Sequence, residues 1–123
     1  MDSFAVLAKL RAAGLTLGLV SNREESLDPY AESIHLRSYF DFTLSAGQAG
    51  CFKPSPGIFQ LALEKSGGVA PADAVYVGDN FYADAVGALS VGMSAILVDP
   101  RNAFAGFHDR RVRHLREILP FIL

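Results

Sequence analysis

The chain has 123 residues, of which half are hydrophobic, and its 11 basic and 13 acidic side chains give a formal net charge of -2. This length suits one domain with a core of its own, and the charge balance excludes the strongly basic surface of a nucleic-acid-binding protein. The single cysteine, Cys51, excludes an internal disulfide and is typical of a reducing compartment. No apolar run is long and uninterrupted enough to span a membrane, so we expect a soluble, cytoplasmic protein without a membrane partner.

Short apolar runs alternate with segments of helical periodicity along the chain. The pattern predicts helices at residues 3–13, 27–37, 56–65, 81–89 and 109–119. It predicts strands at residues 15–20, 42–45, 74–77 and 95–98, and a loop at 47–52. Strands that alternate with helices of about ten residues indicate an α/β fold with a doubly wound parallel sheet. We expect this single domain to occupy residues 1–123.

Two carboxylates follow the predicted strand at 74–77. Gly78 allows a sharp turn, Asp79 comes next, and Asp84 lies five residues later in a predicted helix. Ligands of open α/β sheets bind at the carboxyl ends of the strands, and two carboxylates there suit a hard cation such as Mg²⁺. The structural alternative is that Asp79 caps the helix and Asp84 is a solvated helix residue.

A hydroxyl and an ammonium group are predicted at the same edge of the sheet. Ser21 and Asn22 end the strand at 15–20, and Lys53 lies in a loop after the next strand. A hydroxyl and backbone N–H groups can hold phosphate oxygens, while a lysine neutralises their charge. Ser21 could instead cap a turn, and Lys53 could be an ordinary surface lysine, but their joint placement favours phosphoryl chemistry.

The order of these residues resembles the later motifs of the haloacid dehalogenase (HAD) superfamily of hydrolases. The matching runs are Val20-Ser21-Asn22, Lys53-Pro54-x-Pro56 and Val77-Gly78-Asp79-Asn80-x3-Asp84. The resemblance implies that Ser21 binds phosphate within the motif that includes Asn22, and that Lys53 steadies the nucleophile and the phosphate. It further implies that Asp79 is the principal metal-binding acid and Asp84 the second. The implied reaction is Mg²⁺-dependent hydrolysis of phosphate esters through an aspartyl-phosphate intermediate.

The first motif of that family, an Asp-x-Asp pair after the first strand, does not occur in these 123 residues. The resemblance therefore implies a truncated HAD-like core that lacks its first strand, its nucleophile and the cap inserted after them. We expect weak or absent Mg²⁺ binding, and little turnover by the chain alone. If the chain is active, its substrate is a small phosphorylated metabolite. The alternative is a non-catalytic partner-binding module or pseudoenzyme that uses the HAD fold.

In the HAD family the missing strand lies between those that correspond here to residues 17–20 and 75–77. Without it, both strands have inner edges with unpaired N–H and C=O groups. We expect the two edges either to pair directly or to be filled by a second copy of the chain or by a complementing chain.

Overall fold

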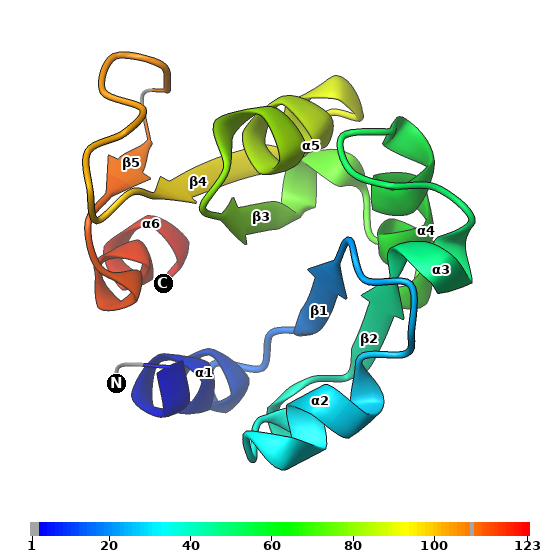
Figure 1. Ribbon diagram of the computed structural model, residues 1–123. Helices are drawn as coiled ribbons and strands as arrows, with labels where there is room; N and C mark the ends of the chain where they lie inside the picture. Colours follow the sequence, from blue (N-terminus) through cyan, green and yellow to red (C-terminus); the bar gives the residue numbers. More distant parts are fainter. Residues whose placement is uncertain (1–2, 109) are drawn as a thin grey trace.

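Parallel strands with helices on both faces organise the computed structural model, which describes residues 3–108 and 110–123 (Figure 1). The strands are β1 (Gly18–Ser21), β2 (Phe42–Ser45), β3 (Val75–Gly78), β4 (Ser94–Val98) and β5 (Arg111–Val112). The α-helices are α1 (Ser3–Ala12), α2 (Asp28–Ser33), α3 (Ala46–Ala49), α4 (Pro56–Lys65), α5 (Gly87–Ser90) and α6 (Leu119–Ile122). A π-helix, η3 (Phe81–Val86), leads into α5, and short 3-10 helices are η1 (Arg37–Tyr39), η2 (Pro71–Asp73) and η4 (Leu115–Ile118). The predicted α/β class is confirmed.

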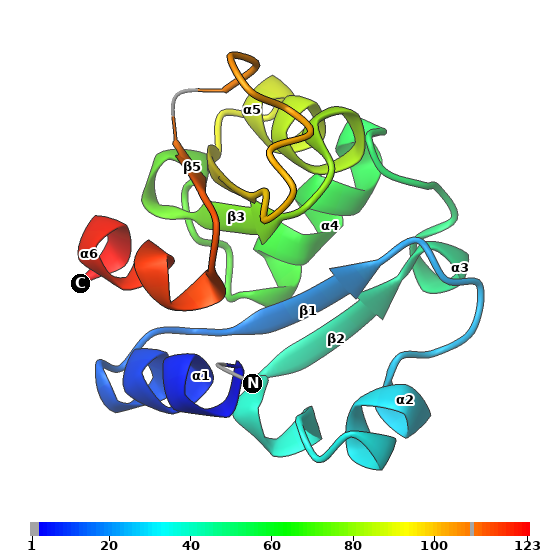
Figure 2. The same ribbon diagram turned by 60° about the vertical axis from the view of Figure 1, so that its left-hand side comes forward.

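The sheet is divided into two parts. β1 pairs in parallel with β2, in a register that places Ser21 opposite Ser45. β3, β4 and β5 form a second parallel sheet in that order. In Figure 2 the arrowheads of β1, β2 and β3 point to the same side, so the carboxyl ends of these strands face one region. Among residues 3–108 and 110–123, β1 and β3 each have one strand neighbour, so the expectation that their inner edges pair directly is wrong.

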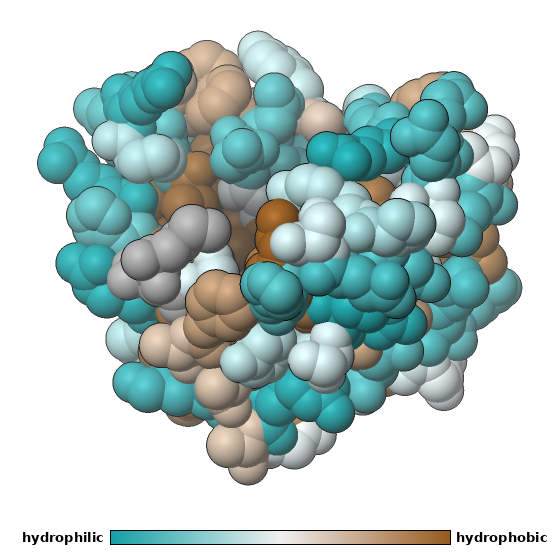
Figure 3. Space-filling view, turned by 60° about the horizontal axis from the view of Figure 1, so that its bottom comes forward, coloured by the Kyte–Doolittle hydropathy of each residue, from teal (hydrophilic) through white to brown (hydrophobic). Residues whose placement is uncertain are grey.

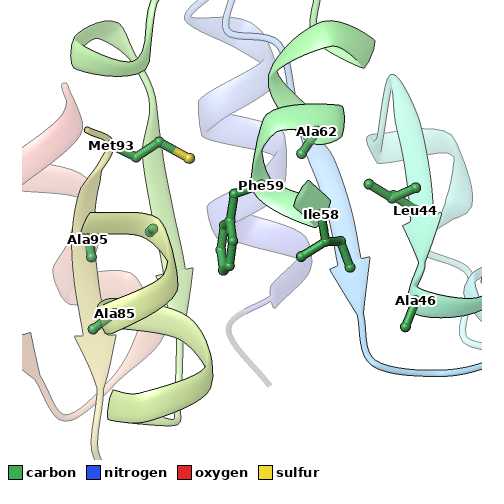
Figure 4. Close-up of a cluster of buried hydrophobic side chains, with 9 residues drawn as sticks. Leu44, Ala46, Ile58, Phe59, Ala62, Ala85, Met93 and Ala95 are labelled. Atoms are coloured by element: carbon green, nitrogen blue, oxygen red, sulfur yellow. The ribbon is translucent and has the colours of Figure 1, made fainter. Parts of the chain in front are cut away.

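Two hydrophobic clusters fill the two sides of this arrangement. One joins Leu44 of β2 and Phe59 of α4 to Ala85, Ala88 and Ala95, and Figure 4 shows Phe59 pointing from α4 into its centre. The other joins Val6 and Leu10 of α1 to Ile96, Val112 and Ile118. Since β4 contributes Ala95 to one cluster and Ile96 to the other, its two faces are both buried, as expected for a strand inside a parallel sheet.

Local sequence explains where several elements begin and end. Pro56 occupies the first turn of α4, where its missing N–H costs nothing, and Ser55 is the N-cap residue as predicted. The short helix α3 falls in the predicted loop, because Ser45 and Gln48 form a reciprocal capping box that starts a helical turn. Helix α2 stops at Ser33 and not at residue 37, where the predicted helix ends. His35 has a left-handed backbone with φ at 61°, which does not continue a right-handed helix.

The predicted helix at residues 109–119 is wrong. Its first residue, Asp109, lies outside the described residues, and the chain then forms β5 and η4. Leu97 donates its N–H to the Arg110 carbonyl, and Asp99 donates to the Val112 carbonyl. Pairing with the open edge of β4 therefore outweighs the helical spacing of hydrophobic residues in this segment.

The face of the molecule in Figure 3 is largely hydrophilic, with hydrophobic residues around a central hollow. No helix within the described part of the chain is long and apolar enough to cross a membrane.

Candidate active site

A cleft of about 380 Å³ lies between the unpaired edges, where β1 and β3 approach their carboxyl ends. Its polar lining comes from Lys53, Tyr76, Asp79 and Asp84. Its apolar lining comes from Val20 of β1, Val77 of β3, Val98 of β4 and Leu115 of η4. Three residues predicted from the sequence to form the site, Lys53, Asp79 and Asp84, therefore line one cleft.

Two of the residues that line the cleft, Lys53 and Asp84, form an ion pair. Lys53 Nζ donates to Asp84 Oδ1 at 2.6 Å, and the two side chains are only 12% and 5% exposed. Lys53 is thus no ordinary surface lysine, and Asp84 is no solvated helix residue. At this degree of burial each charge needs its partner, because removing a charge from water is costly.

The second oxygen of Asp84 holds the turn after β3. Asp84 Oδ2 accepts hydrogen bonds from the backbone N–H groups of Asp79 and Asn80, both at 3.0 Å. Gly78 leaves room for this carboxylate, since a Cβ at that position would lie 2.3 Å from Asp84 Cγ. The bonds fix the backbone from which the Asp79 side chain projects. Asn80, rather than Asp79, caps η3 by accepting the Ala83 N–H.

Tyr76 is a site residue that the sequence reading missed. Its ring lies 5.5 Å from Lys53 Nζ and packs edge-on against Phe59 at 5.0 Å. Burial of the ring raises the pKa of the Tyr76 hydroxyl. Burial alone would lower the pKa of Lys53, but the interactions with Tyr76 and Asp84 outweigh it and raise the pKa, so Lys53 is cationic at neutral pH. The sequence signal was an aromatic residue with a polar tip inside an otherwise aliphatic strand.

Ser21 and Asn22 lie beside the cleft rather than in its lining. Ser21 is the last, half-buried residue of β1. The next side chain, Asn22, contacts the backbone of Lys53 through both of its polar atoms. The end of β1 is therefore attached to the loop that carries the lysine.

The donor set of the cleft does not by itself make a complete magnesium site. Three protein donors occupy the oxygens of Asp84, so a metal there would compete with Lys53. Asp79 is exposed and is the better-placed ligand. Across residues 3–108 and 110–123, no three His, Cys, Asp or Glu residues are grouped as a metal site. Magnesium binding by Asp79 and Asp84 stays a prediction.

Comparison with known proteins agrees with this arrangement. A family model described as a haloacid dehalogenase-like hydrolase matches residues 2–92. The chain belongs to this family. Haloacid dehalogenase-like hydrolase domain-containing protein 3 of Mus musculus is 42% identical over 88 residues, which cover 72% of this chain and 35% of the relative. A phosphoserine phosphatase of Thermus thermophilus is 38% identical over 122 residues, which cover 95% of this chain and 48% of the relative.

The fold of HAD-like hydrolases extends over almost the whole chain. An HAD phosphatase from Thermococcus onnurineus superposes with a TM-score of 0.89 at 33% sequence identity, over 98% of this chain and 56% of that structure. This chain thus spans about half, or less, of the length of these relatives.

Proposed function

We propose that this chain is the phosphate-binding part of a phosphate-ester hydrolase that acts on a small phosphorylated metabolite. The observation that carries the proposal is the buried Lys53 ammonium, held in the cleft beside Asp79. An ammonium has three N–H donors, so Lys53 can keep its bond to Asp84 and still donate to a phosphate oxygen. Two relatives support the substrate class, since their names describe them as phosphoserine phosphatase and glyceraldehyde 3-phosphate phosphatase.

Phosphate binding is tested by titrating inorganic phosphate into the protein while amide shifts are followed by NMR. We expect shifts concentrated at Ser21, Asn22 and Lys53, and their loss in Lys53→Ala. Arg11→Ala is a suitable control, because Arg11 forms an exposed ion pair with Asp41 away from the cleft lining. Equal binding by Lys53→Ala would refute the proposed role of Lys53.

We further propose that the chain alone does not turn over phosphate esters at an enzymatic rate. These residues contain no Asp-x-Asp pair to provide a nucleophile and a proton donor. Loss of the nucleophile from a catalytic unit costs on the order of 10⁶ in rate in a serine protease. Any Mg²⁺ that this chain binds alone rests mainly on Asp79 and is weakly held, since Mg²⁺ requires a near-complete octahedral shell.

The test is an aryl phosphate assay at millimolar Mg²⁺, with Asp79→Asn as the comparison. We expect no turnover above the background in either sample. Robust turnover that Asp79→Asn abolishes would reveal a nucleophile outside the residues assigned here.

A second candidate is a partner-binding module, which the unpaired edges of β1 and β3 favour. We propose that these edges accept a further strand from a second copy or from a complementing chain, in the cytoplasm. Backbone pairing along both edges would satisfy N–H and C=O groups that β1 and β3 leave open. Sedimentation at increasing protein concentration tests whether a second copy of the chain is the partner. A molecular mass that stays monomeric would exclude it.

A further inference from the structure

The Asn22 side chain forms a two-point contact with the backbone of Lys53. Asn22 Oδ1 accepts the Lys53 N–H at 2.7 Å, and Asn22 Nδ2 donates to the Lys53 carbonyl at 3.3 Å. One amide side chain thereby satisfies both backbone groups of a residue that lies outside the helices and strands. A two-point contact fixes the orientation of a peptide backbone as well as its position.

Through this contact Lys53 connects the two parts of the divided sheet. Its backbone is bound at the end of β1, while its ammonium is bound to Asp84, whose carboxylate holds the turn after β3. A lysine has a flexible four-carbon stem, so the place of its ammonium depends on where its backbone is held. β1 and β3 do not pair with each other, so no strand ladder between them sets this distance.

We propose that Asn22 is a positioning residue, which holds the Lys53 backbone so that the ammonium reaches both Asp84 and a bound phosphate. The bonds to Lys53 use one N–H and one oxygen lone pair of the Asn22 amide, which leaves one N–H as its only donor for a direct contact with the ligand. Since Ser21 precedes it, the same contact sets the spacing between the Ser21 hydroxyl and Lys53. This inference rests on the proposed phosphate-binding function.

Two substitutions separate positioning from ligand contact. Asn22→Ala removes both hydrogen bonds, whereas Asn22→Asp keeps an oxygen that can accept the Lys53 N–H. Glu25→Gln is the control, because it changes an exposed side chain of the same loop with none of these contacts. For each protein, hydrogen exchange of the Lys53 amide and the Kd for inorganic phosphate are measured by NMR. The β4 amides report whether the fold is intact.

We expect Asn22→Ala to speed Lys53 amide exchange about tenfold and to raise the phosphate Kd about tenfold, the effect of one or two lost hydrogen bonds. Asn22→Asp should keep the slow amide exchange, and Glu25→Gln should match the parent protein in both measurements. If Asn22→Ala raises the phosphate Kd but leaves the Lys53 amide exchange unchanged, Asn22 contacts the ligand directly and the proposal is overturned. Faster exchange with an unchanged Kd would also overturn it.

The two measurements keep this inference separate from the proposed function. If the parent protein binds no phosphate, the proposed function fails, and with it the claim that Asn22 serves ligand binding. The exchange data would then still decide whether Asn22 holds the Lys53 backbone.

Discussion

The hydrogen bonds around the ion pair between Lys53 and Asp84 make the two residues depend on each other. The Lys53 ammonium donates a hydrogen bond to one oxygen of Asp84, and the backbone N–H groups of Asp79 and Asn80 donate to the other. Removing one partner of such a buried pair leaves an uncompensated charge, which is more costly than losing the pair as a whole.

We therefore predict strong coupling between these two residues. Lys53→Met should lower the free energy of unfolding by about 3 kcal/mol, because Asp84 keeps two backbone donors but loses its cation. The double variant Lys53→Met/Asp84→Asn should cost clearly less than the sum of the two single variants. The double-mutant cycle is measured by urea unfolding of the parent protein, Lys53→Met, Asp84→Asn and the double variant.

The exposed pair Arg11–Asp41 provides the matched control for this cycle. Its side chains are 40% and 41% exposed, so Arg11→Met should cost about 1 kcal/mol or less. If Lys53→Met costs no more than Arg11→Met, the buried pair is not a stabilising contact.

At the scale of elements, Asp99 organises the loop between β4 and β5. Asp99 is 4% exposed and accepts the backbone N–H groups of Ala103 at 2.8 Å and Phe104 at 2.9 Å. It also accepts a hydrogen bond from Arg111 of β5 at 3.2 Å. The loop brings the ring centroids of Phe104 and Phe107 to 6.4 Å and 5.3 Å from that of Phe81.

We predict that Asp99 makes the stability of this loop depend on acid pH. Burial alone would raise the pKa of Asp99, but the hydrogen bonds from Phe104, Ala103 and Arg111 outweigh it and lower the pKa. A carboxyl with a lowered pKa contributes stability above its unfolded value of about 3.9, and this contribution is lost as the pH falls through the folded value. Asp99→Asn should therefore reduce stability at pH 7 and reduce it less at pH 3.

The measurement for Asp99 is urea unfolding of the parent and of Asp99→Asn between pH 7 and pH 3. Asp73→Asn is a suitable control, because Asp73 lies exposed in η2. A difference between parent and Asp99→Asn that stays constant over this range would contradict the prediction.

At the scale of the whole molecule, the division of the sheet is the main consequence of the tertiary structure. β4 pairs with a strand on each side, whereas β1 and β3 each pair on one side only among the residues that the structure describes. An unpaired edge leaves its amides to water, and local opening there costs little free energy.

We predict that hydrogen exchange divides the strands in the same way. The amides of β4 should be the most protected, while in β1 and β3 the amides that face the cleft should exchange fast and only those bonded to β2 or β4 should be slow. Amide-resolved NMR exchange measures this directly. Equal protection of both edges of β1 would mean that the isolated chain fills the gap, by self-association or by rearrangement.

The sequence alone determined the local parts of this protein. The residues of β2 and α4 follow from apolar runs, proline and cap residues, because these signals act over a few neighbouring residues. The order of the motifs that contain Lys53, Asp79 and Asp84 indicated the HAD-like family. Only the tertiary structure decided that Asp84 binds Lys53 and two amides, that Tyr76 lies against the ammonium, and that residues 111–112 extend β4 instead of forming a helix. It also left one edge of β1 and one edge of β3 without a strand partner among residues 3–108 and 110–123. These features depend on which groups the fold brings together from distant positions in the chain. A backbone group or a charged side chain binds the partner that lies close to it in the folded protein, even where the local sequence favours a different structure.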